Sequence, residues 1–592
     1  MRNLKLSDYV IEFLKEQGVH TIFGYQGGAI THLIDSIGKT DGVSFLSSYH
    51  EQGAAFAAEG YARVTNNIGV AMATSGPGAT NLITGIGSAY FDSIPCLYLT
   101  GQVNTYEYKK SDGIRQVGFQ ETDIVSIVKP IVKFAKMIVD SKKIRFYLEK
   151  AVYLAKTGRP GPVLLDIPMD IQRAEVDIKN LCSYYDSQEY KDLSLDNNIE
   201  YMQHKVIDML EVLKDSERPV ILTGGGVRTA NATEDLLRFI HYTHIPVVST
   251  LMGLDGIDHQ RPEFVGFIGA YGNRYANLTI ANADVVIVMG SRLTSRQTSP
   301  NPNTFAREAR IIHIDIDKHE MDRAVKSHLS IQGDLRKFLK VINETLSNIT
   351  LHNNFEGWLS QINNYKKQYP SYPTQQELNA IDPNKMMKII SSMLDGKTII
   401  CTDVGQNQMW VAQSFEIKHG QRLLNSGGMG AMGFALPSAI GAYKASPDST
   451  IIAIAGDGGI QMNIQELQTI VREKMPIKIF VVNNKALGMI RHFQEMYFDS
   501  CYLGTIDGYN TPDFIKLGEA YGILSYKISS YEQLWSIKDK LEDNYSYLFE
   551  IDLNNITYVI PKLSMGRPIE DQDPVVSREE LKSNMIIPVL DK

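Results

Sequence analysis

Cysteine is scarce in this sequence of 592 residues. Only Cys96, Cys182, Cys401 and Cys501 are present, and no two of them form a CxxC pair. A disulfide framework or a zinc site is therefore not expected, and a reducing cytoplasm is the expected location. The first residues, MRNLKLSDYVIEFLKEQGV, interrupt their apolar positions with charges at helical spacing, which is not the pattern of a signal peptide.

Long apolar runs and an excess of positive charge are missing too. No run approaches the roughly 20 apolar residues of a membrane-spanning helix. Lys and Arg number 59 against 67 Asp and Glu, which gives a formal net charge of −8. This mild acidity argues against a nucleic-acid binder that relies on a basic face. We therefore expect a cytoplasmic protein without nucleic-acid or membrane partners.

Short apolar runs that end in Gly, Asp or Asn occur from one end of the chain to the other. Examples are VAMAT, PVLLDIP, PVILTGG, DVVIVMGS, TIIAIAGDG and IKIFVVNN, and helical patterns separate them. Runs of this length suit buried parallel strands, whose carboxyl ends carry the functional site. The pattern predicts an α/β fold made of doubly wound parallel sheets.

Two polar stretches divide the chain. Residues 176–200 are acidic and aperiodic, and residues 351–385 contain PSYP and NAIDPN, so both are predicted to be linkers or surface excursions. The tail, 561–592, is too rich in Pro and charge for a core element. Three domains are then predicted, at 1–175, 200–345 and 380–560.

The first and third domains share a pattern. AAFAAEGYARVTNNIGVAMATSGPGATNL and ALPSAIGAYKASPDSTIIAIAGDGGIQMNI both run from a small-residue helix through a polar turn to an apolar strand and a Gly-rich turn. Two copies of one unit suggest a duplicated domain. The alternative is that any two βαβ units look alike.

The sharpest local signal is Gly456-Asp457-Gly458, followed by Asn483-Asn484 at the end of the next apolar run. A glycine turn at the end of a strand favours phosphate, and Asp457 and Asn484 offer the oxygen ligands that Mg²⁺ requires. GDG alone usually marks an ordinary turn. With the second motif at this spacing it resembles the signature of thiamine diphosphate (ThDP)-dependent enzymes.

An acid in the first domain is expected to complete such a site. SYHEQGAAFAAEGYAR offers Glu51, at the start of a small-residue helix, and Glu59, about two turns later. Glu51 suits proton exchange, whereas Glu59 is expected to be a structural partner. The alternative for Glu51 is an acid that complements the helix dipole. The neighbouring SGPGATN favours the first role, because it is a second Gly-rich turn in the matching repeat.

Nearly the whole chain resembles the catalytic subunit of acetolactate (acetohydroxyacid) synthase. The resemblance rests on FGYQGGA, HEQGAAFAAEGYAR, ATSGPGATNL, GFQET, GRPGPVLLDIP, STLMGL, GDGGIQMNIQEL and VVNNKALGM, in the order pyrimidine-binding, central and diphosphate-binding domain. It implies that Glu51 activates the cofactor by protonating the aminopyrimidine. Catalysis at the reacting centre then also involves Gly28 and Gln120, with Phe119 facing the substrate.

The resemblance also implies a set of cofactor ligands. Mg²⁺ is expected on Asp457, Asn484 and the main-chain carbonyl of Ala486. The remaining ThDP contacts are expected from Val404, Gly405, Gln406, Asn407, Gly430, Met432, Gly458 and Met489, with Gly430 and Met432 at the aminopyrimidine.

The central domain resembles the FAD-binding domain of the biosynthetic synthases. GGG at 224–226, GSRLTSR at 290–296 and HIDID at 313–317 carry this likeness. It implies flavin contacts from Gly224, Gly225, Arg292 and Asp315. Arg292 also stands where the family uses an arginine to grip the acceptor's carboxylate. The alternative is a vestigial domain without flavin.

The chain departs from the family around the acceptor. Biosynthetic synthases usually read V-M-Q-W after LGM, whereas this chain has Ile490-Arg491-His492-Phe493. Ala270-Tyr271 replaces the usual Met-His, and 104–118 inserts a charged segment before Phe119. Arg491 and Phe493 are therefore candidate acceptor residues. Arg491 could serve a phosphorylated acceptor or simply pair with Glu495, four residues on.

The predicted function is ThDP- and Mg²⁺-dependent carboligation with bound FAD. Pyruvate loses CO₂, and its two-carbon unit is transferred to a second carbonyl, with pyruvate as acceptor giving 2-acetolactate for branched-chain amino acid biosynthesis. The alternatives are transfer onto a nucleotide-linked keto-sugar, and a flavin-dependent 2-keto acid oxidase or decarboxylase. The resemblance implies a homodimer or homotetramer with shared sites, and a regulatory subunit is a further expected partner.

Overall fold

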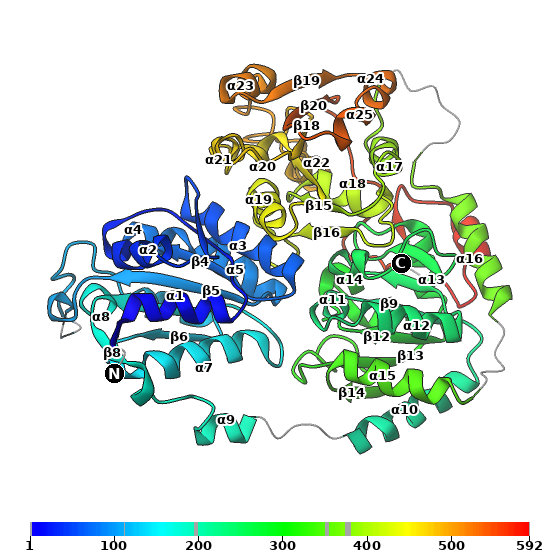
Figure 1. Ribbon diagram of the computed structural model, residues 1–592. Coiled ribbons are helices and arrows are strands. Elements are labelled where there is room, and N and C mark those ends of the chain that lie inside the picture. The colour runs from blue at the N-terminus through cyan, green and yellow to red at the C-terminus, as the bar shows by residue number, and fades with distance from the viewer. Residues whose placement is uncertain are drawn as a thin grey trace.

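Three six-stranded parallel sheets form three units of the molecule (Figure 1). This computed structural model describes residues 3–109, 111, 113–193, 199–349, 355–372 and 380–590. Parts of the two predicted linkers and of the 104–118 segment lie outside these residues. The α/β prediction of doubly wound parallel sheets is confirmed, and the exact domain boundaries stay a prediction.

The N-terminal unit is built on the sheet β3-β2-β4-β5-β7-β6. Its strands are β2 (Thr21–Gly24), β3 (Ser44–Ser47), β4 (Gly69–Ala73), β5 (Cys96–Gln102), β6 (Phe134–Met137) and β7 (Val163–Pro168). The main helices are α1 (Leu6–Glu16), α2 (Thr31–Gly38), α3 (Glu51–Thr65), α4 (Pro77–Asn81), α5 (Ile83–Asp92), α6 (Ile124–Val128), α7 (Ile144–Lys156) and α8 (Met169–Gln172). A short antiparallel pair, β1 (Asn3–Lys5) with β8 (Glu175–Asp177), closes the unit.

The C-terminal unit repeats this topology. Its sheet has the order β16-β15-β17-β18-β20-β19, so both sheets read 2-1-3-4-6-5 when strands are counted along the chain. The predicted repeat of one unit is therefore confirmed at the level of topology, and an origin by duplication stays a prediction. The strands are β15 (Thr398–Thr402), β16 (Arg422–Asn425), β17 (Thr450–Gly456), β18 (Lys478–Asn483), β19 (Leu524–Ile528) and β20 (Tyr547–Asp552). The helices are α17 (Pro383–Ser392), α18 (Gln406–Ser414), α19 (Ala435–Ala445), α20 (Asp457–Gln461), α21 (Glu466–Arg472), α22 (Gly488–Tyr497), α23 (Phe514–Tyr521), α24 (Tyr531–Trp535) and α25 (Lys538–Glu542).

The central unit has a different strand order, β11-β10-β9-β12-β13-β14. The strands are β9 (Pro219–Thr223), β10 (Val247–Ser249), β11 (Phe264–Phe267), β12 (Val285–Met289), β13 (Arg310–Asp315) and β14 (Leu329–Gln332). Helices on and beside this sheet are α10 (Ile199–Lys214), α11 (Gly226–Thr229), α12 (Thr233–Thr243), α13 (Arg274–Ala281), α14 (Ser295–Thr298), α15 (Leu335–Leu346) and α16 (Glu356–Gln368). The short helix α9 (Gln188–Leu193) lies between the first two units.

The two sister units pack through equivalent small-residue helices, α3 and α19. A Cβ on Gly60 would lie 2.4 Å from the carbonyl oxygen of Ser438, and one on Gly441 would lie 1.9 Å from that of Ala57. Because only glycine fits at such separations, the backbones of the two helices touch. This contact fixes the N-terminal unit against the C-terminal unit within one chain.

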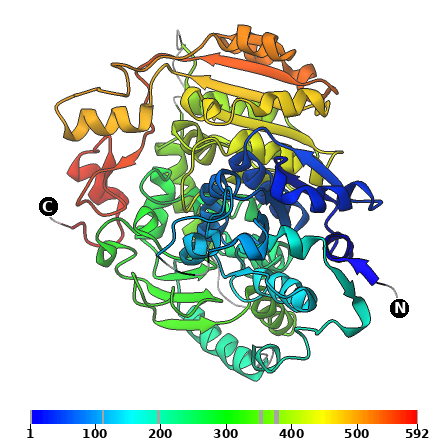
Figure 2. The ribbon, with the colours of Figure 1, turned by 90° about the vertical axis from the view of Figure 1, so that its left-hand side faces the viewer.

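The tail packs against the central unit, as Figures 1 and 2 show for the red segment. The prediction that 561–592 holds no core element is wrong, because Ile569 and Leu581 are buried in an apolar cluster of the central unit. Its strands are β21 (Lys562–Leu563) and β22 (Gln572–Asp573), and its helix is α26 (Arg578–Asn584). The charges are tolerated since they meet partners there; the Glu570 carboxylate lies 2.7 Å from the Arg307 guanidinium.

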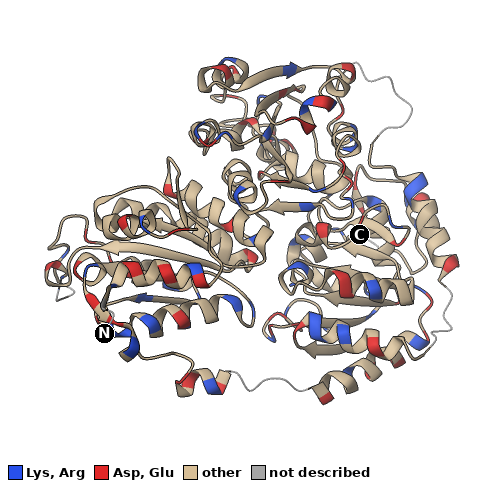
Figure 3. Ribbon diagram, viewed as in Figure 1, with Lys and Arg blue, Asp and Glu red and all other residues tan. Residues whose placement is uncertain are grey.

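Charged residues of both signs are spread along the described part of the chain. Figure 3 shows Lys and Arg interspersed with Asp and Glu along the helices of all three units. Among the described residues, no helix is long and apolar enough to cross a membrane.

Candidate active site

A cleft of about 260 Å³ opens at the carboxyl edge of the C-terminal sheet, where β15 and β17 lie side by side. Connections leave these two strands toward opposite sides of the sheet, and such a switch point is where α/β sheets bind ligands. The cleft gathers all the predicted ThDP and metal residues: Val404, Gly405, Gln406, Asn407, Gly430, Met432, Asp457, Gly458, Asn484, Ala486 and Met489.

Asp457 offers an unsatisfied oxygen to this cleft. Its Oδ1 accepts a hydrogen bond from the Gly458 main-chain N–H at 2.9 Å. Its Oδ2 is buried and has no hydrogen-bond partner among the described residues. Burial raises the pKa of this carboxyl group to about 6. A buried carboxylate oxygen without a partner is costly, and a cation would compensate it.

Asn484 supplies a neutral oxygen beside it. The Nδ2 group donates to Gln406 Oε1 and to Thr557 Oγ1, both at 2.8 Å, which leaves the Oδ1 atom as the free end of the amide. One carboxylate, one amide oxygen and the carbonyl of Ala486 form a hard-oxygen set that fits Mg²⁺. Within the described part of the chain no group of three His, Cys, Asp or Glu side chains could hold a metal, so this mixed set is the candidate.

Asp403, which the sequence analysis did not single out, holds main-chain segments beside the cleft in place. The carboxylate accepts hydrogen bonds from the main-chain N–H groups of Val404 (2.9 Å), Gly433 (2.9 Å) and Ala435 (3.0 Å). Burial raises its pKa to about 6. One side chain thus joins the turn after β15 to the start of α19. Its place directly after TIICT was the available signal.

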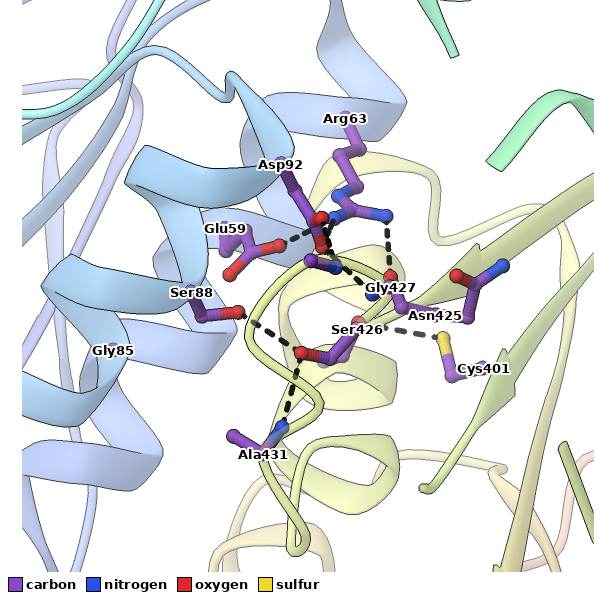
Figure 4. Close-up of polar contacts among 12 residues, drawn as sticks. Glu59, Arg63, Gly85, Ser88, Asp92, Cys401, Asn425, Ser426, Gly427 and Ala431 are labelled. Carbon is purple, nitrogen blue, oxygen red and sulfur yellow. Dashed lines mark hydrogen bonds and ion pairs between the residues drawn. The ribbon is translucent and has the colours of Figure 1, made fainter. Parts of the chain in front are cut away.

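The loop 426–432, which carries Gly430 and Met432, is fastened to the N-terminal unit (Figure 4). The Asp92 carboxylate accepts from the N–H groups of Gly427 at 3.0 Å and Gly428 at 2.6 Å. Arg63 donates to the carbonyl of Asn425, directly before the loop, at 2.8 Å. Two side chains from α3 and α5 therefore set where the loop can lie.

Glu59 completes this buried cluster. Its carboxylate lies 2.6 Å from the Arg63 guanidinium, which also lies 3.0 Å from Asp92. Both acids have fully buried side chains. Burial outweighs the attraction of Arg63 and raises the pKa of Glu59 to about 7. The structure places Glu59 as a structural partner, as the sequence predicted.

Glu51 lies at the carboxyl edge of the N-terminal sheet instead. It is buried at the start of α3, and its Oε2 atom accepts from Asn81 Nδ2 at 2.9 Å. A Cβ on Gly78 would lie 3.0 Å from its other carboxylate oxygen. Glu51 therefore borders the Gly-rich turn after β4, as the matching repeat predicted.

Gln120 and Gly28 border the same turn. A Cβ on Gly76 would lie 2.9 Å from the Cβ of Gln120. Gly28 is exposed, and the next residue, Ala29, donates its N–H to Thr74 Oγ1 at 3.1 Å. Phe119 is 86% exposed.

One chain does not bring the two halves of the predicted site together. Of the described residues that line the 260 Å³ cleft, none comes from the N-terminal unit, and Glu51, Gly28, Phe119 and Gln120 lie outside it. The predicted acid and the predicted metal ligands thus stand at different carboxyl edges, although α3 and α19 lock their units together.

A second cleft, of about 420 Å³, lies between the N-terminal and central units and contains the predicted flavin residues Gly224, Gly225, Arg292 and Asp315. A Cβ on Gly224 would lie 2.1 Å from the Gly290 carbonyl, so two strand-end turns meet here without side chains. Burial raises the pKa of Asp315, at the end of β13, to about 6. An acid at such a strand end suits ribose hydroxyls, and the cleft fits a dinucleotide.

Arg159, from GRPGPV, lines the 420 Å³ cleft and was not singled out in the sequence analysis. It pairs with Glu320 at 2.8 Å and Asp317 at 3.2 Å, and its Nε donates to Ser93 Oγ at 2.9 Å. The arginine therefore ties the N-terminal unit to the central unit across the cleft. The sequence offered one signal for a role of Arg159, which is its position between Gly and Pro just before a strand.

Arg292 lines both the 420 Å³ cleft and a smaller cavity of about 70 Å³, which Ala270 and Tyr271 also line. None of the described residues accepts a hydrogen bond from its guanidinium, which suits a carboxylate ligand. Arg296, which sequence reasoning missed, lines the small cavity and also the 260 Å³ cleft.

Arg491 and Phe493 lie on α22 and do not line the described cleft. The Arg491–Glu495 pair that the sequence left open is present, with 3.0 Å between the charged atoms. Phe493 packs against Tyr497, with 4.9 Å between ring centroids, and Phe498, with 5.7 Å. An acceptor role for either residue stays a prediction.

Comparison with known families gives three matches in chain order. Residues 4–127 match "Thiamine pyrophosphate enzyme, N-terminal TPP binding domain". Residues 206–342 match "Thiamine pyrophosphate enzyme, central domain", and residues 403–548 match "Thiamine pyrophosphate enzyme, C-terminal TPP binding domain".

Similar proteins match along nearly the whole chain. An acetolactate synthase large subunit of Lactococcus lactis is 37% identical over 96% of both chains. Acetolactate synthase isozyme 2 large subunit of Escherichia coli is 35% identical over 95% of this chain and 97% of its own. A probable acetolactate synthase large subunit of Methanocaldococcus jannaschii is 38% identical over 93% of this chain and 92% of its own. The chain therefore belongs to the acetolactate synthase large-subunit family of thiamine pyrophosphate enzymes.

Proposed function

We propose that this transferase decarboxylates pyruvate and transfers the two-carbon unit to a second pyruvate, giving 2-acetolactate. The observation that carries the proposal is the 260 Å³ cleft. It joins the unpartnered Oδ2 atom of Asp457, the free Oδ1 atom of Asn484 and the turn 404–407 at one sheet edge. Acetolactate synthase large subunits that match along nearly the whole chain support the same reaction.

Asp457, Asn484 and the Ala486 carbonyl would hold Mg²⁺, and the turn 404–407 would take the diphosphate. ThDP, when bound, supplies the carbanion chemistry that lets pyruvate lose CO₂ and its remaining carbons attack a carbonyl. Glu51 holds and exchanges a proton at the aminopyrimidine.

We infer that the working site is shared between two chains of a homodimer. Glu51 and the Mg²⁺ ligands lie at different sheet edges of one chain, so a second copy would bring its Glu51 to the first copy's cleft. The strongly exposed Phe119 would then also face that partner cleft. The large-subunit relatives favour a regulatory subunit as a further partner.

FAD is proposed for the 420 Å³ cleft, where Gly224, Gly225 and Asp315 form the dinucleotide cradle. Arg292, at the border between that cleft and the small cavity, is proposed to bind the acceptor's carboxylate as a bidentate partner. Absorbance of the purified protein in the flavin bands, and flavin released on denaturation, would test the first assignment. A protein purified without flavin that neither binds FAD nor gains activity from it would contradict it.

A product assay tests the proposed reaction. The purified chain is incubated with ThDP, Mg²⁺ and labelled pyruvate, alone and with 2-ketobutyrate or a nucleotide-linked keto-sugar. Labelled 2-acetolactate from pyruvate alone is the expected product. Release of acetaldehyde or acetate, or transfer only to the keto-sugar, would contradict the proposal.

A further inference from the structure

Arg491 is one of the largest side chains buried in the protein, with 1% of the residue exposed. Its guanidinium lies 3.0 Å from the Glu495 carboxylate and 4.8 Å from the centroid of the Tyr558 ring. It also donates a hydrogen bond of 2.6 Å to the carbonyl oxygen of Thr557. These contacts direct the cation toward the segment after β20 and hold it there.

The Thr557 carbonyl starts a chain of hydrogen bonds that ends at the metal set. It accepts from Gln406 Nε2 at 2.9 Å, and Gln406 Oε1 in turn accepts from Asn484 Nδ2 at 2.8 Å. A carbonyl oxygen can only accept, so it forces the nitrogen end of the Gln406 amide toward itself. The oxygen end of Gln406 then forces the nitrogen end of Asn484 inward. The Asn484 oxygen is thereby left for the cation.

We propose that Arg491 is a positioning residue, which fixes the Thr557 carbonyl and through it the metal-facing orientation of Asn484. The inference rests on the proposed Mg²⁺–ThDP function of the cleft. It assigns the arginine to the cofactor and not to the acceptor.

The surrounding groups support this assignment. Glu495 neutralises the buried cation and accepts from the Tyr558 hydroxyl at 2.8 Å, so acid, arginine and ring form one cluster around residues 557 and 558. A Cβ on Gly488 would lie 1.9 Å from Gln406 Oε1 and 2.9 Å from Asn484 Nδ2. The relay therefore passes through a space that only glycine leaves open.

Calorimetric titration of the cofactor-free protein with Mg²⁺ and ThDP tests the proposal without relying on turnover. Arg491→Met keeps a long apolar chain but removes the hydrogen bond to Thr557, and should weaken Mg²⁺–ThDP binding about tenfold. Thr557→Val removes the hydroxyl that accepts a hydrogen bond from Asn484, and this change buries no charge. It should also weaken Mg²⁺–ThDP binding about tenfold. Thr557→Ser keeps that hydroxyl and is the matched control, with parental affinity expected.

Two further measurements separate the cofactor role from an acceptor role. Raising Mg²⁺ should restore the turnover of Arg491→Met, which a general packing defect would not do. The ratio of 2-ketobutyrate to pyruvate use should stay at the parental value. Unchanged Mg²⁺–ThDP affinity in Arg491→Met, or a shifted acceptor ratio in that variant, would overturn the proposal. A parent that fails to bind Mg²⁺–ThDP would instead defeat the proposed function itself.

Discussion

Mixing two inactive variants should regenerate activity if each site is shared between chains. Glu51→Gln removes the proposed proton exchange from the N-terminal half of a site, and Asp457→Ala removes the proposed Mg²⁺ carboxylate from the C-terminal half. In a mixed dimer one site carries both defects, whereas the other combines an intact Glu51 with an intact Asp457. This follows because these residues lie at separate sheet edges of one chain.

The size of the effect follows from random assortment. After full subunit exchange of equal amounts, half of the dimers are mixed and each has one working site of two, so about a quarter of parental activity is expected. The assay is the rate of 2-acetolactate formation, with exchange confirmed by mass-tagged chains. Asp457→Ala mixed with Asn484→Ala is the control and should stay inactive, since both changes lie in the same half. Confirmed exchange without recovery would refute the shared site.

Two further predictions follow from particular contacts. Gly488→Ala should displace Gln406 and weaken Mg²⁺–ThDP binding at least about tenfold by calorimetry, since a new Cβ would lie 1.9 Å from Gln406 Oε1. Gly357→Ala, at a helical glycine with open space, is its control and should bind as the parent does; equal affinity in both variants would contradict the relay. Glu59 has a pKa of about 7 in the folded protein against an ordinary 4.5. The folded state therefore binds this proton more tightly than the unfolded state does, and the free energy of unfolding should fall as the pH rises from about 4.5 to 7. The melting temperature of Glu59→Gln should fall less over this pH range than that of the parent. Parallel profiles of melting temperature against pH for the variant and the parent would argue against a raised pKa at Glu59.

Much of the fold could be predicted because local pattern and burial agree. Runs such as TIIAIAGDG and IKIFVVNN became the buried strands β17 and β18, and the shared pattern of the first and third domains became one topology used twice. The tail was misjudged for a physical reason. Whether Pro and charge exclude a segment from the core depends on its partners, and the partner of Glu570, Arg307, lies 263 residues away in the chain.

The candidate site also contains residues that the local sequence indicates and residues that only the fold reveals. Asp457 and Asn484 could be predicted as metal ligands because strand-end position and side-chain chemistry can be read from the local sequence, and the structure places both in one cleft. Thr557 could not, since it acts only through groups that the fold brings to it. Asp403 also follows a strand directly, but its contacts with Gly433 and Ala435 are visible only in the fold. Arg491 illustrates the limit best: its sequence neighbourhood offered both an acceptor role and the Glu495 pair, and only the buried hydrogen bond to Thr557 shows where the guanidinium is directed.

Helix α3 contributes residues to both halves of the proposed shared site. It carries Glu51 at its start and Arg63 near its end, and Arg63 and Asp92 hold the 426–432 loop of the same chain. In the mixed dimer, the working site takes its loop from the Glu51→Gln chain. Adding Asp92→Asn to that chain should lower the recovered rate about fivefold, which corresponds to about 1 kcal/mol of lost hydrogen bonding. Adding Asp92→Asn to the Asp457→Ala chain should leave the recovered rate unchanged, because the 426–432 loop of that chain belongs to the inactive site. Equal losses from both placements would show that Asp92 acts on the whole fold and not on the loop of its own chain.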